Sequence, residues 1–348
     1  MPKSDLDAAL ERDPLTFMKT HSVLPQDYTG HNPGIFNKAN SATPGGAAID
    51  ETLVIERRAR QIAYTKLAQV VDRQNNEAQA NTYNLFFETG DRIGTAAADN
   101  IACWFLPWAS NHLTTFQLPP KIPPKPGAAA ARTSLDPDLF FTAAISGCSV
   151  MVPGDPKSPI VTHGGTASSR SKLTDENAFV AGNSRLHWQN LFERELTKRG
   201  LSLPIHGVHK GDYINAAFSG TTPEAKQYEQ FLKDDKLTSM RVDRVMPQGC
   251  VFGVRDPAGS WSFYLQKTVT FTFTRLRKKK GFLSTSYVPA VVPSKKGLAP
   301  GEKAAMIEDQ KTASVTIEVV RFFPGNGKAA ASALLPPAQV KAILESYL

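Results

Sequence analysis

Hydrophobic and polar positions alternate most regularly in the last third of the chain. Four short segments there place apolar side chains at every second residue, and Phe271 and Phe273 share one face of the third segment. A period of two residues is typical of strands with one buried face. The pattern therefore predicts strands in VFGV, WSFYLQ, VTFTFTRL and SVTIEVVRFF, and a long loop in GFLSTSYVPAVVPSKKGLAPGEK.

Apolar runs broken by turn-forming residues occupy the middle of the chain. Residues 81–118 are rich in aromatic residues interrupted by Gly and Pro, which predicts strands and turns. The Pro-rich residues 119–127 are typical of a stiff, extended connector. From residue 138 the run LFFTAAISGCSVMV leads into the turn PGDP and the second run PIVTH, which together predict strand, turn and strand.

Four segments have patterns that favour helices. Residues 50–78 place apolar side chains near helical spacing with charges between them, which predicts a long amphipathic helix. That helix could pack on the rest of the protein or bind a partner through its apolar stripe. The stripe comprises Leu53, Ile55, Ile62, Leu67, Val70 and Val71. The other predicted helices are 183–200, which ends at Gly200, a shorter one over 221–238, and a final one over 336–347.

These elements predict an α+β protein with a mixed β-sheet or β-sandwich core surrounded by helices and long loops. Residues 1–48 are rich in Pro, Gly, Asn and Thr and are expected to be a flexible lead-in. We therefore expect an N-terminal flexible segment and amphipathic helix over residues 1–78, and a folded domain over 79–348.

Composition and charge restrict the function classes. The 348 residues carry a net charge of +8, to which a short basic run at residues 275–280 contributes strongly. The run is interpreted either as a solvated strand end or as a docking patch for an acidic partner. The three cysteines have no zinc-ligand spacing and do not suggest a disulfide framework, so a reducing compartment is expected. The N-terminus lacks an apolar signal sequence, and no apolar run is long enough to span a membrane.

Cys148 and His163 are the candidate catalytic pair. His163 follows Cys148 by fifteen residues and one predicted turn, so adjacent strands of a hairpin can bring the two side chains together. A neighbouring imidazole can activate a thiol as a nucleophile. Gly147 leaves space for a substrate carbonyl, and backbone N–H groups at such a turn can form an oxyanion hole. The alternative is that Cys148 is a small buried hydrophobe. His206 and His209 form only a weak candidate metal pair.

The segment FFTAAISGCSVMVPGDPKSPIVTHGGT resembles the Leu-Ser-Gly-Cys glutamine deamidase superfamily. This family includes the catalytic domain of cytotoxic necrotizing factor, the Burkholderia lethal factor and the chemoreceptor glutamine deamidase. The resemblance assigns Cys148 as nucleophile and His163 as base, and in two of these members a threonine at the place of Thr142 orients the imidazole. Ile145 replaces the usual leucine. The family fold is a β-sandwich wrapped by helices and loops, which makes residues 79–348 a cysteine-dependent deamidase-like catalytic domain.

The resemblance implies a toxin or effector that converts a glutamine of a target protein to glutamate through a thioester on Cys148. The N–H groups of Cys148, Gly147 and Ser149 would stabilise the oxyanion. No metal or organic cofactor is expected. The expected partner is a host protein, either a Rho-family GTPase or an RNA helicase of translation initiation, and stable binding to nucleic acid or membrane is not expected. We expect a monomer that is secreted without a Sec signal peptide and acts in the host-cell cytoplasm.

Three alternatives stay open at this level. A lysine amine that replaces water at the thioester would make the protein a transglutaminase, and peptide-bond cleavage on the same Cys–His dyad would make it a cysteine peptidase. A non-enzymatic binding protein would instead use the basic run at residues 275–280 and the predicted helix at 50–78.

Overall fold

The computed structural model describes the chain in fifteen stretches, most of which are strands. They are residues 3–26, 62–71, 78–89, 99–107, 112–121, 136–146, 148–165, 193, 196–197, 204–213, 240–280, 285–293, 305–325, 342 and 345. The strands form a mixed sheet, as the sequence predicts, while helices contribute less to the described part than the expected α+β architecture implies.

The larger sheet has nine strands, of which most are antiparallel. The parallel pairs are β1 with β3 and β4 with β6. The strand order is β1 (Ser22–Pro25), β3 (Ala78–Thr89), β2 (Ile62–Val71), β4 (Ile101–Leu106), β6 (Leu139–Thr142), β10 (Met240–Arg255), β11 (Trp261–Lys280) and β12 (Thr285–Pro289), with β15 (Gln310–Phe323) also paired to β11.

The second sheet is antiparallel and carries the candidate catalytic pair. Its order is β5 (His112–Gln117), β8 (Ile160–Gly165), β7 (Ser149–Pro153) and β9 (Ile205–Val208). A separate two-stranded ribbon joins β13 (Val291–Pro293) to β14 (Met306–Glu308). The helices whose bounds the structure describes are α1 (Asp5–Arg12), α2 (Pro14–Thr20) and α5 (Lys210–Tyr213), and no described helix has the length and apolar character needed to cross a membrane.

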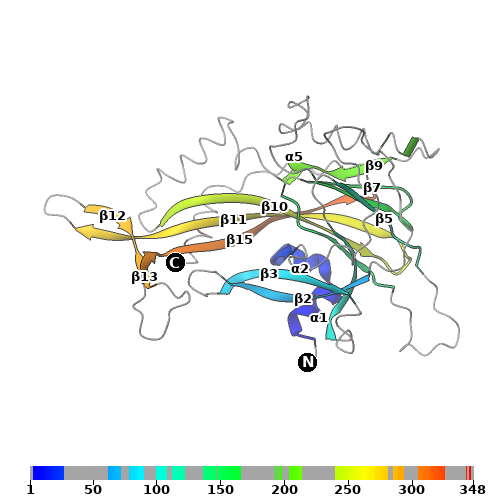
Figure 1. The fold of residues 1–348 in the computed structure, drawn as a ribbon. Coiled ribbons are helices and arrows are strands. Elements are labelled where there is room, and N and C mark those ends of the chain that lie inside the picture. Colours follow the sequence, from blue (N-terminus) through cyan, green and yellow to red (C-terminus); the bar gives the residue numbers. More distant parts are fainter. Residues whose placement is uncertain are drawn as a thin grey trace.

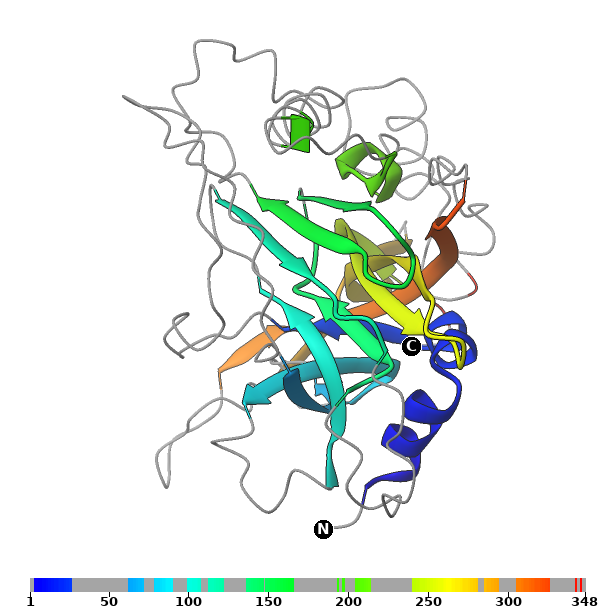
Figure 2. The ribbon, with the colours of Figure 1, turned by 90° about the vertical axis from the view of Figure 1, so that its right-hand side faces the viewer.

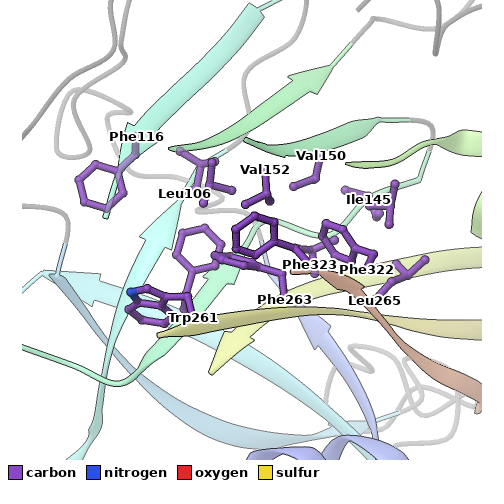
Figure 3. Close-up of a cluster of buried hydrophobic side chains, with 14 of the residues drawn as sticks. Leu106, Phe116, Ile145, Val150, Val152, Trp261, Phe263, Leu265, Phe322 and Phe323 are labelled. Carbon is purple, nitrogen blue, oxygen red and sulfur yellow. The ribbon is translucent and has the colours of Figure 1, made fainter. Parts of the chain in front are cut away.

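A hydrophobic core fills the space between the two sheets. Figure 3 shows Val150 and Val152 of β7 pointing toward Phe263 and Phe323 of the larger sheet. These side chains are fully or almost fully buried, so the two sheets form a sandwich around them. A second core on the other face of the larger sheet includes side chains of α1 and α2, and α2 lies between β15 and the β2–β3 hairpin (Figure 1).

Residues 5–25 are folded and contain α1, α2 and β1, so the predicted flexible lead-in is wrong for them. Ser4 caps α1 by accepting from the N–H of Asp7, and Asp13 caps α2 by accepting from the N–H of Thr16. Both caps are recognisable in the sequence, but the turn-forming composition of the following residues concealed them. In Figure 2 these helices, in dark blue, lie on the opposite side of the larger sheet from the green strands β7 and β8.

The helix predicted over residues 50–78 is wrong for residues 62–71, which form β2. The predicted apolar stripe is not the buried side there, since Val71 is 43% exposed while Ala63, Tyr64 and Thr65 are buried. β2 pairs with β3 on one edge and β4 on the other. These non-local pairings override a local period that resembles a helix. The proposed boundary at residue 78 falls at the first residue of β3, within this hairpin.

The hairpin β7–β8 and the strands of the last third confirm the predicted pattern, with two differences. The segments WSFYLQ and VTFTFTRL belong to one continuous strand, β11. The predicted long loop is wrong where it contains β12 and β13. The helices predicted over 183–200, 221–238 and 336–347 lie outside the described residues, apart from five isolated positions in the first and last, all of which are helical.

Candidate functional site

The β7–β8 hairpin places Cys148 and His163 on the same face of the smaller sheet. Val150 lies directly opposite His163, and Cys148 lies two residues before Val150. Cys148 lies just before the first residue of β7, and its place in the same core as Val150 puts it on the side of the sheet that carries His163. Val150 and Cys148 both belong to the core between the sheets. The register therefore brings the thiol and the imidazole into the same buried layer.

His163 is a buried imidazole without a hydrogen-bond partner. Its side chain is 1% exposed, and neither Nδ1 nor Nε2 has a partner. Burial lowers the pKa of His163 to about 3, because the apolar surroundings disfavour the charged ring. The ring is therefore neutral near pH 7. Buried polar groups that lack partners are rare in folded proteins, and each one requires an explanation.

Cys148 is held through its backbone rather than through a bond to His163. The hydroxyl of Tyr213 donates to the Cys148 carbonyl at 2.8 Å. Because both nitrogens of His163 are unpartnered, the thiol and the imidazole are not hydrogen-bonded in this structure. Cys148 is 7% exposed, whereas Cys103 and Cys250 are 0% and 1% exposed and burial raises the pKa of their thiols. Cys148 is thus the most accessible of the three thiols.

Thr142 lies on the correct side of its strand but bonds elsewhere. It shares the face of β6 that carries Phe140, a residue of the core between the sheets. Its hydroxyl donates to the carbonyl of Ala143 at 2.8 Å, and its side chain is fully buried. The structure therefore brings Thr142 to the layer that contains His163 without forming the hydrogen bond that the resemblance implies.

The structure describes one of the two residues predicted to line the oxyanion hole, Ser149, and not the other, Gly147. Ser149 is the first residue of β7 and pairs with Gly164 of β8. The Ser149 side chain points to the other face of the sheet, where its Oγ lies 3.0 Å from Nδ1 of His209. The backbone of Ser149 therefore adjoins Cys148, while its hydroxyl interacts with the imidazole of His209 on the other face.

Sequence reasoning missed Tyr213 and the pairing of His209. Both residues follow β9, which pairs with β7 in a register that places Val208 opposite Val150. His209 caps α5, where its N–H donates to Asp212. His206 contacts the ring of Phe323 instead, so the two histidines do not form the suggested metal pair. No sequence signal links these residues to Cys148, because about 60 residues separate them and only strand pairing joins them.

The arrangement offers a thiol, a neutral base and backbone donors, and no group of metal-ligating side chains occurs among the described residues. Such a set can perform acyl transfer from an amide without a cofactor. No protein-family model matches the chain, and a search of curated proteins finds no match either. The likeness to glutamine deamidases therefore rests on the sequence motif between Phe140 and Thr166 alone.

Proposed function

We propose that the protein is a cysteine-dependent deamidase that converts a glutamine of a target protein to glutamate. The observation that carries this proposal is the unpartnered, buried imidazole of His163, on the side of the smaller sheet that faces the core containing Cys148. A structural histidine normally satisfies at least one ring nitrogen. An imidazole left open beside a thiol is what a nucleophile and its base require before substrate binds.

The reaction uses His163 as the base, which requires substrate binding to raise the pKa of the ring from the value of about 3 that burial gives it. The imidazole accepts the thiol proton as the Cys148 sulfur attacks the carboxamide carbon and forms the C–S bond. The C–N bond then breaks, and the ammonia leaves with the proton returned by the imidazolium. Water, deprotonated by His163, hydrolyses the thioester to a carboxylate and the free thiol. Backbone N–H groups of Cys148, Gly147 and Ser149 stabilise the oxyanion in both steps.

We propose that substrate binding brings Thr142, His163 and Cys148 into hydrogen-bonding contact. Catalytic hydrogen bonds are often open in substrate-free enzymes and tighten in the complex. Rotation of Thr142 about its side-chain torsion would release the Ala143 carbonyl and offer its oxygen to one ring nitrogen. That bond would fix the tautomer and leave the other nitrogen toward Cys148. The β-sandwich wrapped by helices and loops, as in the deamidase family, is part of the same proposal.

The substrate and setting follow the family resemblance. We propose a host protein as substrate, with a Rho-family GTPase and a translation-initiation RNA helicase as candidates, and an effector that acts as a monomer in the host-cell cytoplasm. A lysine amine in place of water would give transglutamination, and a peptide-bond leaving group would give proteolysis. Intact-mass measurement of each candidate substrate separates the three products.

The test compares the protein with Cys148→Ser and a matched control, Cys250→Ala. Both variants remove a buried thiol, but only the first removes the proposed nucleophile. We expect the mass increase of amide-to-acid conversion with the unaltered protein and the Cys250 variant, and none with the Cys148 variant. Conversion at an unchanged rate by folded Cys148→Ser would refute the proposal.

One observation favours a second candidate, a non-enzymatic binding protein. Cys148 and His163 are both buried, as expected for residues that only fill a core. Iodoacetamide labelling at neutral pH separates the two candidates. An activated Cys148 labels well before Cys103 and Cys250, and labelling slows when His163 is replaced. A core residue labels slowly and with no dependence on His163.

A further inference from the structure

The far end of β11 extends the larger sheet as a two-stranded ribbon with β12. Among the described residues, β11 pairs with β10 as far as Arg275 and with β15 as far as Thr274. From Leu276 to Lys280 the strand pairs, among the described residues, with β12 alone. Figure 1 shows this ribbon at one end of the molecule, with β7 and β9 at the other end. We call the paired segments Leu276–Lys280 and Thr285–Pro289 the basic ribbon.

The basic ribbon carries four cations and no carboxylate. Arg277, Lys278, Lys279 and Lys280 are all exposed, and alternation along the strand places them on both faces. The facing residues of β12 are Thr285, Ser286, Tyr287, Val288 and Pro289. None of the four cations forms an ion pair with any residue that the structure describes.

Two cations nearer the sheet are neutralised, which distinguishes them from those of the ribbon. Arg275 lies 3.4 Å from Asp309, and Arg241 lies 2.7 Å from Asp243 and 2.9 Å from Glu308. Four successive cations, Arg277 to Lys280, therefore carry charge that no described carboxylate compensates, whereas Arg244 of β10 is a single exposed cation of this kind nearer the sheet. Uncompensated like charges repel one another, so a strand end of this composition gains from an anionic partner.

Exposed apolar side chains accompany these charges. Tyr287 of the ribbon is 42% exposed, and its partner in register is Lys278. Val291 and Met306, on the adjoining β13–β14 ribbon, are 40% and 59% exposed. Met306 is the most exposed large hydrophobic side chain among the described residues. The same end of the molecule thus offers cations, an aromatic ring and aliphatic groups together.

We propose that the basic ribbon and the adjoining β13–β14 ribbon form a docking surface for an anionic lipid bilayer. Lysine and arginine bind the headgroup phosphates, while Tyr287 lies at the interface and Met306 reaches the upper acyl region. A narrow ribbon within the headgroup layer meets phosphates on both faces. The sequence alone favoured a solvated strand end with no membrane role, because it does not reveal the apolar side chains beside the charges.

A bilayer fits these observations better than nucleic acid or an acidic protein. Val291 and Met306 contribute nothing to contacts with nucleic-acid phosphates, which require cations and polar donors. A folded acidic protein presents one surface and would engage one face of the ribbon, which leaves the cations of the other face unpaired. A lipid bilayer has an anionic headgroup layer above an apolar layer. It can therefore contact the cations on both faces of the basic ribbon together with the aliphatic side chains.

The test measures co-sedimentation of the full chain with phosphatidylcholine vesicles and with mixed phosphatidylcholine–phosphatidylserine vesicles. We expect binding to the mixed vesicles only. The variant Lys278→Gln/Lys279→Gln/Lys280→Gln is expected to bind them on the order of 100-fold more weakly, since each cation near an anionic surface contributes about fivefold. The matched control Lys19→Gln/Lys66→Gln/Lys157→Gln removes the same charge from exposed sites elsewhere and retains binding.

A second variant distinguishes a bilayer from other anionic partners. Tyr287→Ser/Met306→Ser is expected to weaken vesicle binding about tenfold through lost apolar burial, with the melting temperature of the protein unchanged. The proposal is overturned if both lysine variants bind alike, if neutral vesicles bind equally well, or if duplex DNA or polyglutamate binds more tightly than the mixed vesicles. Cys148→Ser should bind vesicles normally, so this result is independent of the proposed enzymatic activity.

Discussion

Replacing His163 by leucine is expected to stabilise the protein while it abolishes the proposed activity. The native ring holds one donor and one acceptor in an apolar layer without partners. Each such buried, unsatisfied atom costs about 1–3 kcal/mol. Leucine has a similar volume and no polar atom, and imperfect repacking costs under about 1.5 kcal/mol. We therefore expect the free energy of unfolding at pH 7 to rise by about 1–3 kcal/mol.

The difference between the two proteins should grow in acid. The pKa of His163 is about 3 in the folded protein against a usual value of 6.5. Below pH 6.5 the unfolded chain binds a proton that the folded chain does not, so acid favours unfolding. Between pH 7 and pH 5 this coupling removes about 2 kcal/mol from the unaltered protein. His163→Leu lacks this loss, and its relative stability increases by the same amount.

Urea unfolding at pH 7 and pH 5 measures both effects. The matched control is His206→Leu, which removes a half-buried histidine that already contacts the ring of Phe323. That variant should keep the loss of stability that belongs to His163. A His163→Leu protein that is less stable at both pH values would show that the imidazole has a partner in solution. The unpartnered ring could then no longer support the proposed function.

Two further predictions concern the support of the site. Tyr213→Phe removes the hydroxyl that donates to the Cys148 carbonyl. We expect kcat for deamidation to fall roughly tenfold with KM unchanged. A fall in Tm with normal kcat would indicate that Tyr213 has a structural role only. Gly249→Ala places a Cβ 2.8 Å from Cγ1 of Ile145, beside the bridge between these residues. Overpacking there should lower the free energy of unfolding by about 1–3 kcal/mol in urea titrations, and an unchanged stability would show that Ile145 moves freely.

Local patterns predicted those parts of the fold where one face of a strand is buried. The alternation survives in β11 at residues 261–265 and 269–273, where buried and partly buried side chains alternate. β2 was mistaken for a helix because three successive residues, Ala63 to Thr65, are buried in the middle of the sheet, which removes the alternation. The period of two indicates a strand only where the opposite face is exposed.

The sequence by itself determined the candidate nucleophile and base, since the turn PGDP and two short apolar runs suffice to align a hairpin. It also determined the cluster of cations at residues 277–280. Only the tertiary structure decided that His163 is unpartnered, that Tyr213 holds the Cys148 carbonyl, and that the cations lie beside exposed apolar groups. The physical reason is that a hairpin is set by neighbouring residues, whereas burial and hydrogen-bond partners depend on strands that are distant in the chain.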